Sequence, residues 1–245
     1  MGNGIYNALS GAMTQAQVMD VVSNNLSNVS TPGYKAGRMA FEEVLARSLD
    51  GRPKKDAFVQ TATVKTDWSQ GAMRPTDRKL DVALEGPGYL SVNNGTQEAF
   101  IRGGRMRMRP DGLLTDPSGL PVLGRGGKPL RLPVDTDVSR LTIGRDGTLR
   151  VGAEAVGAFK ITEFASPQNL TRQGDSRYLA PPAAGATPAQ KTGVSQGFLE
   201  SANFNMVRGI SSMIVASRTY QAFHKVMSTF REVDTKVVNE LGRTR

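Results

Sequence analysis

The stretch that decides the fold reads IYNALSGAMTQAQVMDVVSNNLSNV and spans residues 5–29. Its apolar and small side chains recur every three or four residues, which predicts an amphipathic helix with a stripe close to a heptad seam. The other positions are mostly Asn, Gln, Ser and Thr, so both faces of this helix are suited to packing in an assembly. We expect the helix to end at Ser30-Thr31-Pro32-Gly33, because proline disfavours helical backbone at the residue before it and glycine permits a turn.

The C-terminal end of the chain repeats this periodicity. Apolar residues in steps of three and four run from Met206 to Leu241. They predict one helix of roughly 35–40 residues, about 55 Å long. A helix of this length must bury its stripe against another element. The N-terminal stripe is the nearest candidate of matching type, so we expect a coiled-coil-like pair of terminal helices.

Between the two ends the pattern changes to short alternating runs. Residues 80–84 alternate with period two and stop at Gly86-Pro87-Gly88, and the strand-like run 89–92 precedes the hairpin signal Asn93-Asn94-Gly95. Such runs, punctuated by glycine, predict an all-β domain of short antiparallel strands. Residues 48–76 and 180–197 have a looser composition that is typical of linkers.

The expected fold class is therefore α+β, with an all-β domain inserted between two long helices. We divide the chain into an N-terminal helix (1–33), a linker or extended segment (34–75), a β-rich domain (76–179), a second linker (180–197) and a C-terminal helical segment (198–245).

Composition argues against an enzyme. The 245 residues include no cysteine and a single histidine, His224. The first fact excludes disulfides, thiolate metal sites and cysteine nucleophiles, and the second argues against a histidine metal site or a Ser-His-Asp triad. Gly124-Arg125-Gly126-Gly127 lacks the Lys-Ser/Thr ending of a P-loop. We expect no catalytic residue, no cofactor and no metal.

The net charge of +9 leaves an alternative of a different class, a basic protein that binds nucleic acid or peptidoglycan. Its clearest candidate surface is the cluster of Arg102, Arg105, Arg107 and Arg109. Aromatic residues are only 6% of the chain and do not alternate with this cluster, so we expect no nucleic-acid partner. We interpret the arginines as a charged edge strand or a protein–protein contact.

The chain also lacks the patterns of a membrane span and of a secretory leader. No run reaches the ~18–20 apolar residues that a span requires. Residues 1–34 carry Asp20 as their only charge, without the positive start of a cleavable signal peptide.

Four stretches carry a specific resemblance: SNNLSNVSTPGYK (23–35), LDVALEGPGYL (80–90), FIRGGR (100–105) with DGLL (111–114), and GFLESANFN (197–205). In this order and over nearly the whole chain, they resemble the signatures of bacterial flagellar rod and hook proteins, the axial family of the flagellum. The positions that we single out are Asn24, Asn25, Asn28, Thr31, Pro32, Gly33, Leu80, Asp81, Val82, Leu199, Glu200, Asn203 and Arg218.

The chain departs from the family pattern at Ala202, at Gln221 and at Gly103-Gly104. The total length and the modest gap between Lys35 and Lys79 favour the proximal-rod branch, the F type. The distal-rod branch, the G type, is the close competitor.

The resemblance implies a structural subunit of the flagellar basal-body rod, the drive shaft that transmits torque across the periplasm. Terminal helices would form an inner tube, and the β domain would face outward. The implied partners are copies of the chain, other rod proteins and the flagellar type III export apparatus, which takes substrates without a cleavable signal. We expect subunit packing at Ile5, Ala12, Met19, Leu26, Ile210, Met213, Tyr220, Met227 and Phe230. We also expect Asn24, Asn25, Asn28 and Thr31 to cap the helix end and bond neighbouring backbone.

Overall fold

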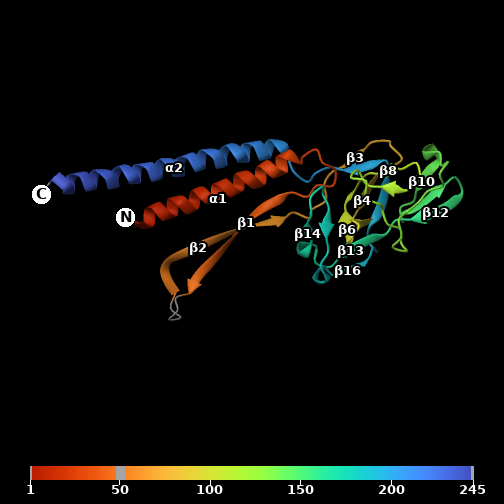
Figure 1. Cartoon of the computed structure of the whole chain (residues 1–245), viewed down its shortest axis with the longest axis horizontal. Coiled ribbons are helices and arrows are strands. Elements are labelled where there is room, and N and C mark those ends of the chain that lie inside the picture. The colour runs from red at the N-terminus through yellow and green to blue at the C-terminus, as the bar shows by residue number, and fades with distance from the viewer. Residues whose placement is uncertain (1, 48–52, 244–245) are drawn as a thin grey trace. The chain divides into compact units, whose positions relative to one another are not determined.

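Two long helices and a two-stranded sheet form the first of two units in the chain. The computed structural model describes residues 2–47 and 53–243. This helical unit comprises Met1–Ser27, Gly37–Lys65 and Asn205–Arg245. It holds α1 (Gly2–Ser27), α2 (Met206–Arg243) and the paired strands β1 (Gly37–Arg47) and β2 (Pro53–Thr66) (Figure 1).

The helices α1 and α2 pack against each other and run in opposite directions (Figure 1). Gly4 faces the Phe230 ring and Gly11 faces the Phe223 ring. A side chain at Gly4 would place its Cβ 2.9 Å from Phe230 Cζ, and one at Gly11 would overlap the Phe223 ring. Glycine therefore lets both aromatic rings lie directly on the backbone of α1.

The contact residues of α2 are seven residues apart, as are Gly4 and Gly11 on α1. Gly209 and Ala216 on α2 are buried, and the rings of Phe223 and Phe230 continue that line. On α1 the buried positions are Ala8, Ala12, Val22 and Asn25. We call this contact the inner seam. The small residues along it allow close approach of the two backbones.

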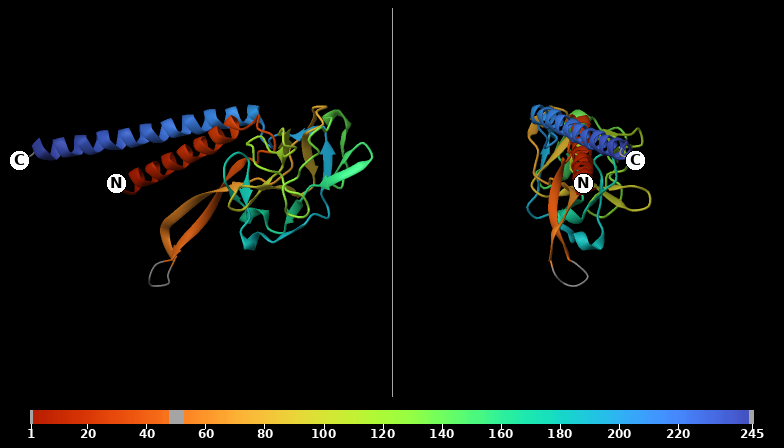
Figure 2. Two further views of the ribbon diagram at one scale, coloured as in Figure 1. Left: turned by 45° about the vertical axis from the view of Figure 1, so that its right-hand side comes forward. Right: turned by 90° about the vertical axis from the view of Figure 1, so that its left-hand side faces the viewer.

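The second unit, the β unit, comprises Asn28–Ala36 and Thr66–Phe204. Its larger sheet has the order β14-β15-β6-β5-β13-β16, and smaller sheets are formed by β17-β4-β7, β10-β11-β12, β18-β3 and β8-β9. Figure 2 shows the ribbon of this unit in two further views. Every strand pairing recorded between them is antiparallel.

The strands of the β unit are short. They are β3 (Met73–Pro75), β4 (Asp81–Glu85), β5 (Tyr89–Asn93), β6 (Glu98–Ile101), β7 (Gly103–Arg105), β8 (Arg107–Met108), β9 (Leu114–Thr115), β10 (Leu141–Ile143), β11 (Thr148–Val151), β12 (Glu154–Ala158), β13 (Ile161–Phe164), β14 (Thr171–Arg172), β15 (Tyr178–Leu179), β16 (Ala186–Pro188), β17 (Gly193–Gln196) and β18 (Phe198–Glu200). Three 3-10 turns cover Val138–Arg140, Pro167–Asn169 and Pro182–Ala184.

Two clusters of buried side chains hold the β unit together. The larger one is aliphatic and includes Val82, Leu90 and Leu149. The smaller one is aromatic: the Tyr89 and Phe164 rings meet edge to face at 5.5 Å, and Trp68 meets Tyr178 at 5.1 Å. Edge-to-face pairs of this kind add about 0.5–1.5 kcal/mol to the burial of the rings.

The observed elements confirm the α+β class. Residues 34–75, expected to be a linker or an extended segment, contain the strands β1, β2 and β3. Residues 180–197 contain a 3-10 turn, β16 and β17, and these strands pair with β13 and β4. The proline-rich composition suggested a linker, but β16 is an edge strand, and a proline such as Pro188 is tolerated there because it removes no hydrogen bond between strands.

The C-terminal segment 198–245 also begins differently from the expectation. Residues 198–200 form β18, which pairs with β3, and the helix starts only at Met206. Asn205 precedes the helix, and its Oδ1 accepts the Arg208 N–H at 3.0 Å, as an N-cap residue does. None of the helices among the described residues is long and apolar enough to cross a membrane.

Candidate functional site

Residues from three separate sequence motifs meet inside the β unit. Lys35, Arg102 and Glu200 are all buried, with at most 3% of each residue exposed. Lys35 Nζ donates to Glu200 Oε1 at 2.6 Å, and Arg102 donates from Nε and Nη2 to Glu200 Oε2 at 3.1 and 3.0 Å. We call these three residues, together with Asn203, the motif junction.

Backbone groups complete the hydrogen bonds of the motif junction. The Gly71 N–H donates to Glu200 Oε1 at 2.9 Å, and Lys35 Nζ also donates to the Ser69 carbonyl at 2.7 Å. Arg102 Nη1 donates to the carbonyls of Gly86, at 2.7 Å, and Gly88. A buried ion network is tolerated only when its remaining donors and acceptors are satisfied in this way.

The charges of the motif junction are unequal, because two cations surround one carboxylate. Burial lowers the pKa of Lys35 below its ordinary value, and the Glu200 carboxylate opposes that shift. Glu200 is therefore the group on which both cations depend.

Gly33 and Asn203 tie the backbone around the motif junction. The Gly33 N–H donates to the Glu200 carbonyl at 2.8 Å. Gly33 has a φ of 70°, and a Cβ there would lie 3.1 Å from Arg102 Cβ, so the position favours glycine on both counts. Asn203 Oδ1 accepts the Ala36 N–H at 2.7 Å, and Asn203 Nδ2 donates to the Asp67 carbonyl at 2.8 Å.

Arg172 is a contributor that the sequence motifs did not reveal. Its guanidinium lies 5.0 Å from the centre of the Tyr34 ring, and it donates to the Tyr34 hydroxyl at 3.3 Å and to the Lys35 carbonyl. Arg102 was expected to share a surface with Arg105, Arg107 and Arg109. It is buried instead, whereas those three are exposed.

Several of the remaining motif positions lie in the helical unit, in the turn after α1, or at the surface. In the helical unit Asn25 is buried, and its side-chain amide bonds both the N–H and the carbonyl of Gly37 at 2.8 Å. In the turn after α1, the Thr31 N–H donates to the Asn28 carbonyl at 3.0 Å. Asn24 and Arg218 are exposed, and Pro32 is half-buried.

The second signature lies in the core of the β unit. Val82 is buried, as is Leu199 of the fourth signature, and Leu80 packs against the aliphatic cluster. The Asp81 carboxylate is also buried, with 1% of its side chain exposed and Arg78 Nε 3.7 Å from Oδ1. Neither Asp81 oxygen has a hydrogen-bond partner among the described residues.

The nine expected packing residues divide between two faces of the helices. Ala12 is buried, and Met213, Tyr220, Met227 and Phe230 are half-buried at the spacing of the inner seam. Ile5, Met19 and Leu26 are half-buried as well, whereas Ile210 is 43% exposed. The stripe expected from the sequence thus mixed the inner seam with the outer surface of α2.

Both helices expose apolar side chains away from the inner seam. On α1 these are Tyr6, Leu9 and Met13, and on α2 they are Met206, Val207, Ile210, Ile214, Val215, Val226 and Val233. Only three other large apolar side chains in the described part of the chain are exposed to this degree: Val64, Val134 and Phe198. Among the side chains that the structure describes, the exposed apolar surface is therefore concentrated on α1 and α2.

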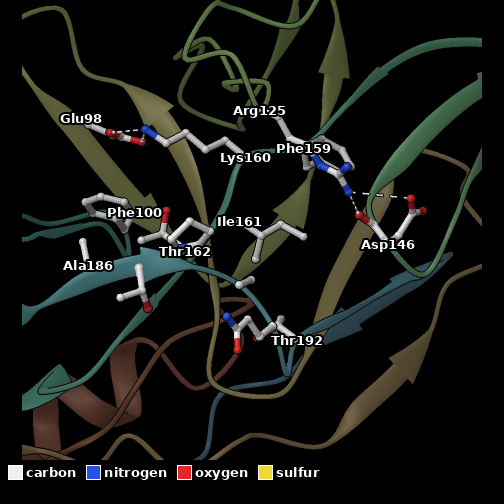
Figure 3. Close-up of a pocket in the computed structure, with 14 residues that line it drawn as sticks. Glu98, Phe100, Arg125, Asp146, Phe159, Lys160, Ile161, Thr162, Ala186 and Thr192 are labelled. Carbon is white, nitrogen blue, oxygen red and sulfur yellow. Dashed lines mark hydrogen bonds and ion pairs between the residues drawn. The ribbon is translucent and has the colours of Figure 1, made fainter.

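A separate cleft of about 740 Å³ opens on the β unit (Figure 3). Phe100, Phe159 and Ile161 are among its lining residues. Lys160 Nζ lies 2.8 Å from Glu98, and Arg125 lies 3.7 Å from Asp146 (Figure 3). No cluster of His, Cys, Asp or Glu in the described residues is suited to a metal ion.

Comparison with known proteins gives matches along the chain. Residues 5–35 match the family model "Flagella basal body rod protein", residues 83–151 match "Flagellar hook protein FlgE/F/G D1 domain", and residues 195–241 match "Flagellar basal body rod FlgEFG protein C-terminal".

Individual relatives are similar over almost their whole length. The chain is 32% identical to the flagellar basal-body rod protein FlgF of Escherichia coli, with 94% of each chain covered. It is 29% identical to FlgF of Caulobacter vibrioides, with 99% of each covered. It is also 29% identical to the rod protein FlgG of Bacillus subtilis, with 98% of this chain and 99% of the relative covered.

Proposed function

The chain belongs to the family of flagellar basal-body rod proteins and is a structural subunit of that rod, and we propose that it polymerises through α1 and α2 in the proximal part of the rod. The family is one of structural proteins, not of enzymes. We extend this to the chain itself and propose that it has no catalytic activity.

The observation that carries the proposal is the apolar surface of the paired helices. Ten of the thirteen exposed large apolar side chains in the described residues belong to α1 and α2. A pair of helices in water normally keeps its apolar residues on the shared face. Apolar side chains that stay exposed after the inner seam has formed mark surface that other subunits cover.

The hydroxyl groups of the helices support the same conclusion. Thr14, Ser211, Thr219 and Thr229 each donate to a carbonyl four residues earlier in their own helix, at 2.9–3.0 Å. Their hydrogen bonds survive when the surface is covered. Burying these side chains in an assembly therefore leaves no donor unpaired.

The motif junction gives a reason for the specific residues of the signatures. It ties residues 33–36, which follow α1 in the sequence, to residues 200–203, which precede α2. We propose that this buried clamp keeps the two connections together while the rod transmits torque. An exposed ion pair would hold the two connections less firmly, because exposed ion pairs contribute only about 0–1 kcal/mol.

The proximal position rests on the modest length between the first two signatures, Lys35 to Lys79, and on the total length of the chain. The relatives include proteins named FlgF and FlgG, so the distal rod is the alternative position. We further propose that the partners are copies of this chain, other rod proteins and the flagellar type III export apparatus, and that the rod containing it crosses the periplasm.

The test of the proposal is Ile210→Asp, which places a charge on the open face of α2 without touching the inner seam. We expect a strain carrying only this variant to lose swimming, and its isolated basal bodies to lack the chain, while the purified variant keeps its circular dichroism. Val134→Asp is the matched control, since Val134 is exposed but lies in the β unit. Normal swimming with Ile210→Asp would overturn assembly through this face.

A further inference from the structure

We propose that the exposed face of α1 in one copy packs antiparallel against an exposed face of α2 in the next copy, with Asp20 opposite Arg218 of that neighbouring copy. This inference rests on the proposed polymerisation through the helices and names the two surfaces that meet. The occupant of each surface is a second copy of this chain.

The surface on α1 is a single strip. Tyr6, Leu9 and Met13 follow steps of three and four residues, so they lie on one side of the helix. They are 71%, 44% and 59% exposed. Asp20 lies seven residues after Met13 and therefore continues the same strip. We call these four residues the α1 strip.

Asp20 is the unusual member of the α1 strip. It is the only charged residue between Met1 and Tyr34. It is exposed, and it forms no ion pair or side-chain hydrogen bond with any described residue of its own chain. A carboxylate that becomes covered in an apolar contact needs a cation or a set of donors. The neighbouring surface must therefore supply one.

The matching surface on α2 is a second strip, distinct from the inner seam. Val215, Arg218, Ala222, Val226 and Val233 are exposed, and their spacing of three, four or seven residues places them along one side of the helix. We call these five residues the α2 strip. Arg218 has no ion pair with any described residue, so its guanidinium is available to a neighbour.

The two strips fit in the antiparallel direction that the chain already uses. Within one copy, Gly4 and Gly11 face Phe230 and Phe223, so seven residues forward on α1 correspond to seven residues back on α2. With Tyr6 opposite Val233, Met13 lies opposite Val226. A further seven residues on each helix place Asp20 opposite position 219. Arg218 is one residue from that position, a rise of about 1.5 Å along the helix. An arginine side chain easily covers that offset.

The ion pair would set the register of the contact rather than supply most of its energy. A single polar pair in an apolar helical contact fixes alignment and partner choice at some cost in stability. Lys225, the other exposed cation nearby on α2, would face the apolar region around Met13 in this register. The proposal therefore distinguishes Arg218 from Lys225, although both are exposed and positively charged.

The arrangement also explains growth into a filament. Each α1 would use one face for its own α2 and the other face for the α2 of a neighbour. The two surfaces of the contact are different, so adding a copy always leaves one strip open. A contact of this head-to-tail type builds an open filament or a ring rather than a closed dimer.

The test uses charge reversal and mixing. Asp20→Arg or Arg218→Asp alone should reduce the amount of chain in isolated basal bodies at least tenfold. Co-expressing both single variants should restore swimming, because alternate copies then place opposite charges together at every contact. Lys225→Asp is the control and should change incorporation by less than twofold.

Each outcome decides the proposal. It is overturned if both single variants assemble normally, or if Lys225→Asp is as harmful as Arg218→Asp. It is also overturned if the double variant D20R/R218D swims but the mixture does not, since that result would assign the pair to one copy. If Ile210→Asp abolishes assembly while mixing gives no rescue, the proposed function stands and only this pairing fails.

An independent experiment is disulfide crosslinking, which is specific here because the chain contains no cysteine of its own. Basal bodies containing Asp20→Cys together with Arg218→Cys should yield a ladder of disulfide-linked multimers on oxidation. A Lys225→Cys variant in place of Arg218→Cys should yield monomers. A fast-migrating, internally linked monomer from the first variant would contradict the proposal.

Discussion

The two units of the molecule treat their charges and apolar side chains in opposite ways. The β unit buries an ion network of Lys35, Arg102 and Glu200 and exposes few large apolar residues. The helical unit leaves Asp20 and Arg218 in solvent, and its helices α1 and α2 expose ten large apolar side chains among the described residues. The β unit thus buries its own charges, whereas the helical unit leaves apolar surface for the neighbouring copies that we propose.

Glycine is used differently in the two units for the same reason. At Gly33 the backbone has a positive φ and makes a turn within a finished fold. At Gly11 the backbone is helical, and the missing side chain makes room for the Phe223 ring. The first use shapes a connection, and the second brings two helices close enough to present a joint outer surface.

The largest expected effect falls on the motif junction. Glu200→Ala leaves Lys35 and Arg102 buried without a counter-charge, and we expect it to lower the unfolding free energy of the β unit by about 3–5 kcal/mol. Urea unfolding followed by Trp68 fluorescence measures this. Arg131→Ala, which removes exposed 3.2 Å contacts with the carboxylate and the carbonyl of Asp111, should cost below about 1 kcal/mol. Equal losses of unfolding free energy in both variants would contradict the expectation that the buried ion network matters more to stability than an exposed ion pair.

A smaller effect is expected in the inner seam. Gly11→Ala forces the Phe223 ring to move, and we expect it to destabilise the helix pair by about 1–3 kcal/mol, although alanine favours helix by about 1 kcal/mol over glycine. Gly4→Ala should be milder, because only one atom of Phe230 lies within 3.0 Å of the added Cβ. Far-ultraviolet circular dichroism during heating compares the melting of the two variants. A gain in helix stability for Gly11→Ala would show that the inner seam is loosely packed.

Changes on the α2 strip should affect assembly and hardly affect stability. Val226→Asp changes a side chain that is exposed in one copy, so its unfolding free energy should stay within about 0.5 kcal/mol of wild type. We nevertheless expect its incorporation into basal bodies to fall at least tenfold, as judged by immunoblotting. A loss of stability that matches the loss of assembly would mean that Val226 already has a packing role in the single copy.

The smallest effect concerns pH and distinguishes buried from exposed carboxylates. Burial raises the pKa of Asp116, so stability linked to this group is present below pH 3.8 and is lost as the pH rises through the folded-state pKa. Asp116→Asn keeps an oxygen for the N–H groups of Ser118 and Leu120. It should therefore raise the melting temperature at pH 7 and change little near pH 3.

Asp137 is expected to give the opposite pH dependence of stability. Hydrogen bonds from Ser139 lower the pKa of this exposed carboxyl, so its contribution is present above pH 3.8 and is lost as the pH falls. Asp137→Asn should lower the melting temperature slightly at pH 7 and have no effect in acid. The same sign for Asp116→Asn and Asp137→Asn would contradict the assignment of burial as the cause at Asp116.

The sequence predicted the element types well where a periodicity is long. Two helices at the ends and short strands between them follow from steps of three and four residues and from glycine-punctuated alternation. It failed where composition hid a pairing partner: residues 180–197 look like a linker, yet β17 lies beside β4. A strand of four residues has too little pattern of its own to be recognised before its neighbour is known.

The candidate site was predicted in parts. Glu200, Asn203 and Gly33 were singled out as motif positions, but nothing in their spacing indicated that Glu200 would accept hydrogen bonds from residues 98 and 165 positions away. Arg102 was grouped with exposed arginines, and Arg172 was not considered at all. Charge patterning along a chain cannot distinguish a buried arginine from an exposed one, because burial depends on what the fold places around it.

By itself, the sequence determined that this protein has two heptad-like ends, no cysteine chemistry and four signatures of the rod family. Those features are local, and each can be recognised within a few turns or strands. The tertiary structure decided which helical residues form the inner seam and which remain open, and it brought Lys35, Arg102 and Glu200 together. These outcomes depend on side chains far apart in the chain competing for the same buried space, which periodicity and composition do not encode.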